Sequence, residues 1–199
     1  MHITRGTLAF AITAVNGLVI LLGALAWGNA MGNAAASTIK IVAIGASNTA
    51  GWGVGAQNAY PAQLDAMLKA SGYNVQVINA GKSFDTTTGM LRRLDAAVAS
   101  DALAVIVQPG GNDLRFFGSK GQRAANIAAI TSRLRARDIN VIVFENGVVP
   151  SDMYQWDGIH FTTQGHKWVA SYILPQVIAL INATRARDDL SGHLPANQE

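Results

Sequence analysis

The amino-acid sequence predicts an α/β domain in which a parallel sheet of about four strands is covered by helices. Short apolar runs rich in Val and Ile alternate with longer amphipathic runs, and the joins between them are short. Repeated β-α units of this kind form parallel sheets with right-handed crossovers. At 199 residues, half of them hydrophobic, the chain is long enough for one good core and too short for two ordinary domains.

Four apolar runs are expected to form the strands: residues 38–45, 74–79, 103–108 and 140–145. They are continuously apolar rather than alternating, which is typical of parallel strands buried on both faces. Between them, amphipathic spacing predicts helices over residues 60–70, 88–99 and 122–136. The first of these has Pro61 in its first turn. A longer apolar helix is expected after residue 160, with a kink at Pro175.

The first 36 residues are predicted to be an export segment. A short basic start is followed by an apolar stretch over residues 8–27, and Ala34-Ala35-Ala36 before Ser37 fits a signal-peptide cleavage site. An uncleaved membrane anchor is the alternative, since about 20 apolar residues can just span a bilayer. The central Asn16 and Gly17 make a poor span and favour cleavage.

Whether the segment is cleaved or stays as an anchor, the domain, residues 37–184, is expected to be exported and to be periplasmic or secreted. Membrane contact is expected only through the N-terminal segment, if it stays uncleaved. Residues 185–199 are predicted to be a polar, frayed tail. The formal charge of +3 is weak and spread along the chain, so no nucleic-acid partner is expected. The chain has no cysteine and therefore no disulfide, and nothing in its sequence predicts an oligomeric state.

Polar residues follow the expected strands at the edge of the sheet where ligand sites form. Ser47 follows the first strand, Gly81 the second and Asn112 the third, while Asp157 and His160 precede the last helix. An acid three residues before a histidine suits a carboxylate that orients a general base. Each residue alone has an ordinary reading as a turn or helix-cap residue. Together they supply a nucleophile, an acid–base pair and oxyanion donors.

In this order the residues resemble the SGNH hydrolases, also called the GDSL esterase and lipase family. Ser47 matches the serine of block I, Gly81 the glycine of block II and Asn112 the asparagine of block III. Asp157 and His160 match the closing D-x-x-H. The resemblance covers roughly residues 38–180. It implies a flavodoxin-like three-layer α/β/α sandwich and a serine ester hydrolase, acting on small-molecule or lipid esters without a cofactor.

Acyl transfer assigns a role to each of these residues. Ser47 is expected to attack the ester carbonyl, His160 to move the proton, and Asp157 to hold the imidazole tautomer. The oxyanion hole is expected to consist of the backbone N–H groups of Ser47 and Gly81 and the side-chain amide of Asn112.

The sequence also departs from the family pattern. Ala46 replaces the aspartate that gives GDSL one of its letters, Asn48 replaces the leucine, and Phe84 stands where a glycine is usual. Only residues 147–156 separate Asn146 from Asp157, where the family usually has a further strand and helix. A compact four-stranded version is therefore expected.

Other functions fit the sequence less well. The Gly51–Ala56 segment approximates a dinucleotide motif, but it starts six residues after the strand ends and no acid ends the second strand. No third ligand joins Asp157 and His160, so no metal is expected. A non-catalytic envelope module that binds acylated glycans or lipids, and an acyltransferase using the same residues, remain alternatives. Four aromatic residues flank the expected site and fit either a pocket or ordinary packing: Trp52, Phe116, Phe117 and Trp156.

Overall fold

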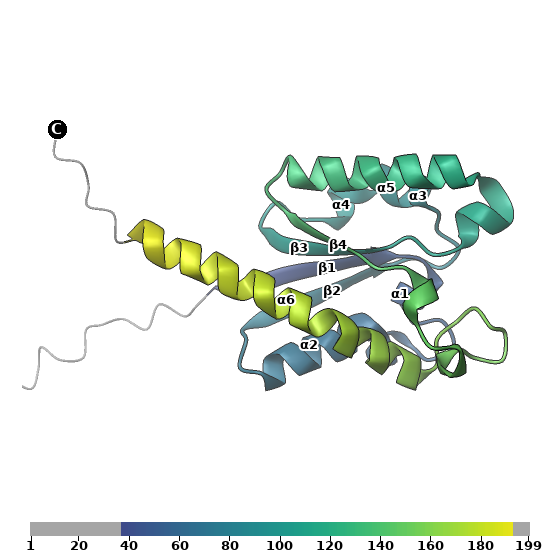
Figure 1. Cartoon of the computed structure of the whole chain (residues 1–199), viewed down its shortest axis with the longest axis horizontal. Helices are drawn as coiled ribbons and strands as arrows, with labels where there is room; N and C mark the ends of the chain where they lie inside the picture. Colours follow the sequence, from purple (N-terminus) through teal and green to yellow (C-terminus); the bar gives the residue numbers. More distant parts are fainter. Residues whose placement is uncertain (1–36, 193–199) are drawn as a thin grey trace, which may run out of the picture. The chain divides into compact units, whose positions relative to one another are not determined.

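The computed structural model describes residues 37–192, so the predicted export segment and residues 193–199 lie outside the described residues. In the described part the sheet has four strands: β1 (Ile39–Gly45), β2 (Val75–Gly81), β3 (Ala102–Gln108) and β4 (Asn140–Val143). All neighbouring strands pair in parallel, in the order β2-β1-β3-β4 (Figure 1). The prediction of a parallel sheet of about four strands is confirmed.

Helices cover both faces of this sheet (Figure 1). One face carries α2 (Tyr60–Ala70) and α6 (Thr163–Gly192). The other carries α3 (Thr87–Arg92), α4 (Leu94–Ala97) and α5 (Lys120–Arg135). Successive residues of β1 point to opposite faces, so Ile41 joins the core cluster under α2 and α6 while Val42 joins the other. The predicted three layers are therefore present.

The helix expected over residues 88–99 is two short helices, α3 and α4, that meet at Arg93. The Arg93 Nε donates a hydrogen bond to Asp85 Oδ2 at 2.7 Å, and its Nη2 donates to the carbonyl of Gly45 at 3.2 Å. The bond to Gly45 spans 48 residues of sequence, and at Arg93 the backbone leaves the helical conformation.

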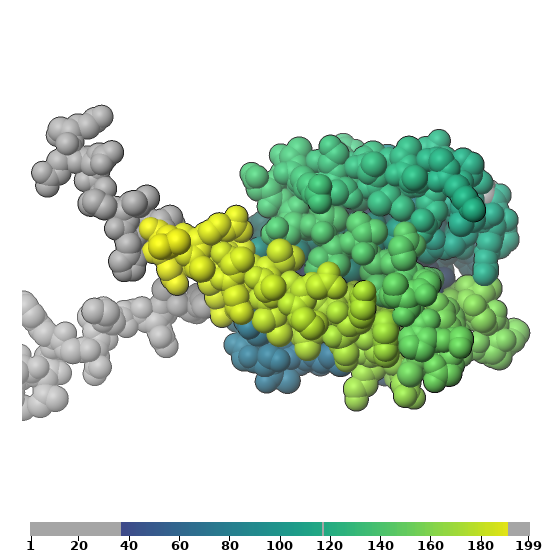
Figure 2. Space-filling model, in the orientation of Figure 1, coloured from purple at the N-terminus to yellow at the C-terminus, as the bar shows by residue number. Residues whose placement is uncertain are grey.

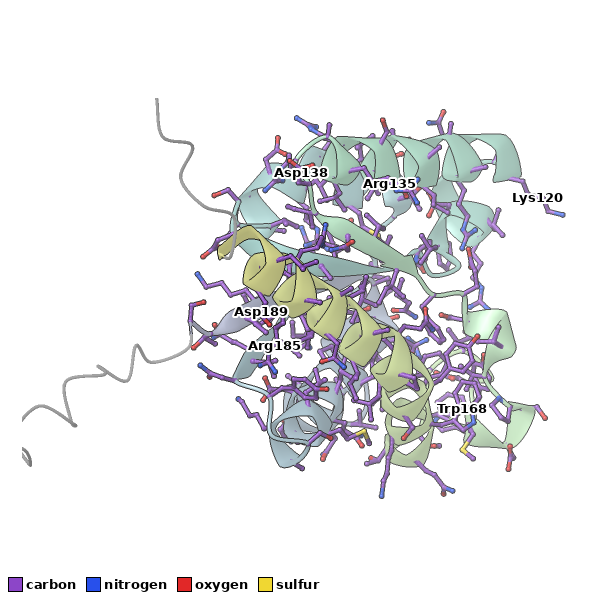
Figure 3. All side chains as sticks on the ribbon, turned by 60° about the vertical axis from the view of Figure 1, so that its left-hand side comes forward. Lys120, Arg135, Asp138, Trp168, Arg185 and Asp189 are labelled. Carbon is purple, nitrogen blue, oxygen red and sulfur yellow. The ribbon has the colours of Figure 1, made fainter. Side chains whose placement is uncertain are left out.

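The last helix, α6, runs through Pro175 and continues to Gly192. It therefore includes residues 185–192, which the sequence pattern assigned to a frayed tail. This stretch is polar, but Ala, Arg and Leu are good helix formers. In Figure 3, Trp168 lies near the start of α6 and Arg185 and Asp189 near its other end. The side chains from Arg185 to Leu190 are exposed, and the yellow end of α6 projects from the rest of the domain in Figure 2.

The chain between β4 and α6 contains no fifth strand among the described residues. It forms two single turns, η3 (Asn146–Val148) and η4 (Ser151–Met153), and an isolated antiparallel bridge between Tyr154 and Phe161. Three further short elements lie at the loops: α1 (Ser47–Ala50), η1 (Ala56–Asn58) and η2 (Asp113–Phe117). None of the helices within residues 37–192 is long and apolar enough to cross a membrane.

Candidate active site

Ser47 lies at the carboxyl end of the sheet, where β1 turns directly into α1. Gly45 permits this tight junction, because a Cβ there would meet the Thr49 side chain and the carbonyl of Gln108. Ser47 is the first residue of α1. Its Oγ lies 2.9 Å from His160 Nε2, although 113 residues separate the two in sequence.

Asp157 holds His160 from two sides. Its Oδ2 lies 2.6 Å from His160 Nδ1, and its Oδ1 accepts hydrogen bonds from the backbone N–H groups of Ile159 and His160 at 2.9 and 3.0 Å. The His160 backbone N–H is the main cause that lowers the pKa of Asp157 to about 2, so the carboxylate is ionised at neutral pH. The structure thus brings the three residues predicted from the sequence into one hydrogen-bonded line.

Asn48, in the turn beside Ser47, forms hydrogen bonds with the loop that carries His160. Its Nδ2 donates to the carbonyl of Ile159 at 3.0 Å, and its Oδ1 accepts from the backbone N–H of Phe161 at 2.9 Å. These two residues flank His160, and the Asn48 side chain is buried. The only sequence signal was that Asn48 stands where the family has leucine.

Trp52 covers the imidazole of His160. The two rings are stacked, with centroids 5.6 Å apart and planes inclined by 27°. The carbonyl of Trp52 accepts a hydrogen bond from Gln155 Nε2 at 3.0 Å, which joins the turn after α1 to the chain just before Asp157. One of the predicted flanking aromatics therefore contacts the site directly.

Asn112 reaches the site from the turn after β3. Its Nδ2 donates one hydrogen bond, to the carbonyl of Asp85 at 2.8 Å, and the second N–H of the same amide is left for a ligand. The next residue, Asp113, is buried and accepts from the backbone N–H and the hydroxyl of Thr87, the latter at 2.6 Å. These bonds fix the Asn112 turn against the start of α3.

Gly81 is absent from the lining of both cavities that include Ser47. Its N–H donates to Asn79 Oδ1 at 2.9 Å, and a Cβ there would collide with the backbone of Thr49 and Ala50. Gly81 therefore allows β2 and α1 to approach each other closely. Phe84, three residues later, lines a cavity together with Ser47 and has a left-handed backbone with φ of +63°. The sequence contained one signal for this conformation: the family usually has glycine at the position of Phe84, and glycine adopts a positive φ most readily.

Two cavities open at Ser47. The larger, of about 340 Å³, lies between the ends of β3 and β4 and includes the polar side chains of Arg115, Arg123, Glu145 and Asn146. The smaller, of about 110 Å³, has aromatic walls. Its lining comprises Ser47, Trp52, Phe84, Asn112, Arg115, Phe116, Ile159 and His160. Trp156 is not part of it, and the side chain of Phe117 lies outside the described part of the chain.

A chain of polar side chains lies beneath the serine turn. Thr49 Oγ1 donates to Gln108 Oε1 at 2.5 Å, and Gln108 Nε2 donates to Asn146 Oδ1 at 2.5 Å. The hydroxyl of Tyr154 donates to the carbonyl of Asn146 at 2.7 Å. Because Thr49 and Gln108 are buried, these bonds satisfy groups that would otherwise be costly to desolvate. They tie the ends of β1, β3 and β4 together.

No metal centre is evident in residues 37–192, where no three His, Cys, Asp or Glu side chains are grouped to hold an ion.

Comparison with known proteins gives consistent results. Over 126 residues the chain is 33% identical to the esterase TesA of Pseudomonas aeruginosa, a match that covers 63% of this chain and 62% of that protein. The matched region thus spans less than two thirds of that relative.

Two solved structures share the fold. A crystal structure of TesA has a TM-score of 0.64 at 24% identity and covers 71% of this chain and 99% of its own. AlinE4, an SGNH-hydrolase family esterase, has a TM-score of 0.54 at 25% identity, with coverage of 72% and 96%. The sequence model of the GDSL-like lipase/acylhydrolase family matches residues 43–157, which run from β1 to the aspartate beside His160. The chain belongs to the GDSL-like lipase/acylhydrolase family.

Proposed function

We propose that this protein is a serine esterase that hydrolyses carboxylic esters through an acyl-enzyme on Ser47. One observation carries the proposal: Ser47 Oγ lies 2.9 Å from His160 Nε2, and His160 Nδ1 lies 2.6 Å from Asp157. This is the arrangement of nucleophile, base and orienting acid that acyl transfer requires. Membership of the family and the similarity to named esterases support the same activity.

In this mechanism Ser47 Oγ attacks the ester carbonyl and its proton passes to His160 Nε2. Asp157 accepts the hydrogen bond from Nδ1–H, which fixes the tautomer and stabilises the imidazolium. The C–O bond to the alcohol then breaks, and His160 returns the proton to the departing oxygen. A water molecule, deprotonated by His160, attacks the acyl-serine. The bond between the acyl carbon and Ser47 Oγ then breaks as His160 returns the proton to Oγ, which releases the carboxylic acid.

The negative oxygen of the tetrahedral intermediate needs hydrogen-bond donors. We assign them to the backbone N–H of Ser47, the free N–H of Asn112 Nδ2 and the backbone N–H of Phe84. Phe84 replaces Gly81 in this set, because the Gly81 N–H already donates to Asn79 and Phe84 lines the cavity with Ser47. Each donor of this kind contributes roughly 3–4 kcal/mol in the transition state.

Ser47→Ala tests the proposal. The variant should lose turnover of nitrophenyl esters from acetate to octanoate while keeping the thermal melting curve of the wild type. Ser171→Ala, at an exposed position of α6, is the matched control and should hydrolyse them at the wild-type rate. Equal, slow hydrolysis by wild type and Ser47→Ala would contradict the proposal and favour a binding module.

The same residues can pass the acyl group to an alcohol instead of water. Hydrolysis and transfer are separated by adding glycerol and measuring acylglycerol against free acid.

For localisation we propose export to the periplasm or the medium after cleavage near Ser37. N-terminal sequencing of the exported protein should find a start near that residue, whereas an intact Met1 in the membrane fraction would indicate an anchor.

A further inference from the structure

Phe84 is the unusual residue of the site. Its backbone has φ of +63°, in the left-handed region that L-residues with a Cβ adopt only at an energetic cost. Its side chain is 69% exposed, so burial in the core does not compensate for this cost. Residues held in such conformations cluster at functional sites. The conformation of Phe84 therefore calls for an explanation at the cavity beside Ser47.

The ring of Phe84 belongs to an aromatic group around the smaller cavity. It meets Trp52 edge to face, with centroids 5.8 Å apart and planes at 78°, and Trp52 in turn stacks on His160. Phe116 stands on the same cavity, and Trp52 and Phe116 are 46% and 60% exposed. Such exposed aromatic residues grouped around one opening are typical of a binding surface for an apolar group.

The position of His160 decides which half of an ester this cavity receives. Both cavities include Ser47, Asn112, Arg115 and Ile159, but only the smaller one includes His160. In the mechanism proposed above, the departing oxygen takes its proton from His160 Nε2. The alcohol half must therefore lie on the His160 side, and the acyl half is directed to the larger, polar cavity.

We infer that Trp52, Phe84 and Phe116 form a subsite for an apolar, aromatic alcohol half of the ester, with Phe84 as a specificity-determining residue. The inference rests on the proposed esterase function. An aromatic ring suits the subsite because it can pair edge to face or stack with these rings. The presence of a ring at a position where glycine is usual is then explained by its contact with the leaving group.

Benzyl acetate and ethyl acetate test this inference, since they share one acyl group and release alcohols of similar acidity. The ratio of kcat/KM for the two esters cancels effects on the chemistry common to both. In Phe84→Ala and Phe84→Gly this ratio should fall about fivefold to tenfold below that of the wild type. Trp156→Ala is the matched control, because Trp156 is 97% exposed and absent from the cavity lining. Its ratio should stay within about twofold of the wild-type value.

The outcomes separate this inference from the function on which it rests. If the wild type hydrolyses both esters and the two Phe84 variants keep the wild-type ratio, the subsite is wrong and the esterase function stands. If the variants instead change the preference among ethyl acetate, butyrate and hexanoate, Phe84 contacts the acyl half and the inference is overturned. If the wild type hydrolyses neither ester, the proposed function itself fails.

Discussion

Replacing Asn48 by leucine tests whether its amide holds the His160 loop in place. The change removes the hydrogen bonds to Ile159 and Phe161 and leaves a backbone carbonyl and a backbone N–H without partners. Each such loss costs about 1–3 kcal/mol when the group is buried, and burial of the leucine offsets roughly 1 kcal/mol. We expect the free energy of unfolding to fall by about 2–4 kcal/mol, which lowers Tm by roughly 10 °C for a domain of this size.

The same substitution should affect catalysis below the melting temperature. Since the two bonds flank His160, their loss allows Nε2 to move away from Ser47 Oγ. A misplacement of about 1 Å can cost roughly 100-fold in rate. We therefore expect kcat for nitrophenyl acetate to fall by about 10-fold to 100-fold, with little change in KM. Asn48→Asp keeps the acceptor for Phe161 and loses the donor to Ile159, and should be intermediate.

Asn182→Ala provides the control for these measurements. Asn182 is exposed and accepts a single hydrogen bond, from the hydroxyl of Tyr73 at 3.3 Å, so its loss should change stability by less than about 0.5 kcal/mol. Calorimetry gives Tm, and stopped assays at 20 °C give kcat. If Asn48→Leu keeps the Tm and the kcat of the wild type, the two hydrogen bonds do not position the His160 loop.

Two further predictions concern stability alone. Burial is the main cause that lowers the pKa of His166 from 6.5 to about 4. The unfolded chain therefore binds this proton first, and the free energy of unfolding in urea should be flat above pH 6.5 and fall by about 3 kcal/mol between pH 6.5 and 4. His166→Asn should remove that slope, and a wild-type slope in the variant would assign it to other groups. Phe84→Gly should melt about 2 °C above Phe84→Ala, because both variants lose the ring and only glycine relieves the left-handed strain. Equal Tm values for the two would show that Phe84 is not strained.

The sequence was sufficient to predict the parallel sheet and the residues of the hydrogen-bonded line from Ser47 through His160 to Asp157. Continuous runs of Val and Ile mark the four strands because both faces of a parallel sheet are buried. Ser47 and the Asp157–His160 pair could be predicted because each lies beside a recognisable strand or helix boundary, where parallel sheets place their sites. None of this required knowledge of side-chain contacts.

Features that depend on distant contacts could not be predicted. The partners of Asn48 lie 111 and 113 residues away, and Arg93, where the helix breaks, bonds to Gly45 across 48 residues. The turn after β2 was ambiguous for a different reason: Gly81 looks like the residue that approaches the substrate, yet a sequence does not report which backbone has positive φ. In this turn the residue with positive φ is Phe84, and a phenylalanine in a sequence does not indicate a positive φ.

The separation of Ser47 from His160 along the chain has a consequence for synthesis and folding. A nascent chain that ends after β4 contains the nucleophile and Asn112 but neither the base nor its aspartate. Under the proposed mechanism such a chain is inert, and hydrolysis begins only once residues 157–161 dock on Asn48. Enzyme activity is therefore a late reporter of folding, and in a refolding experiment it should appear after the sheet has formed.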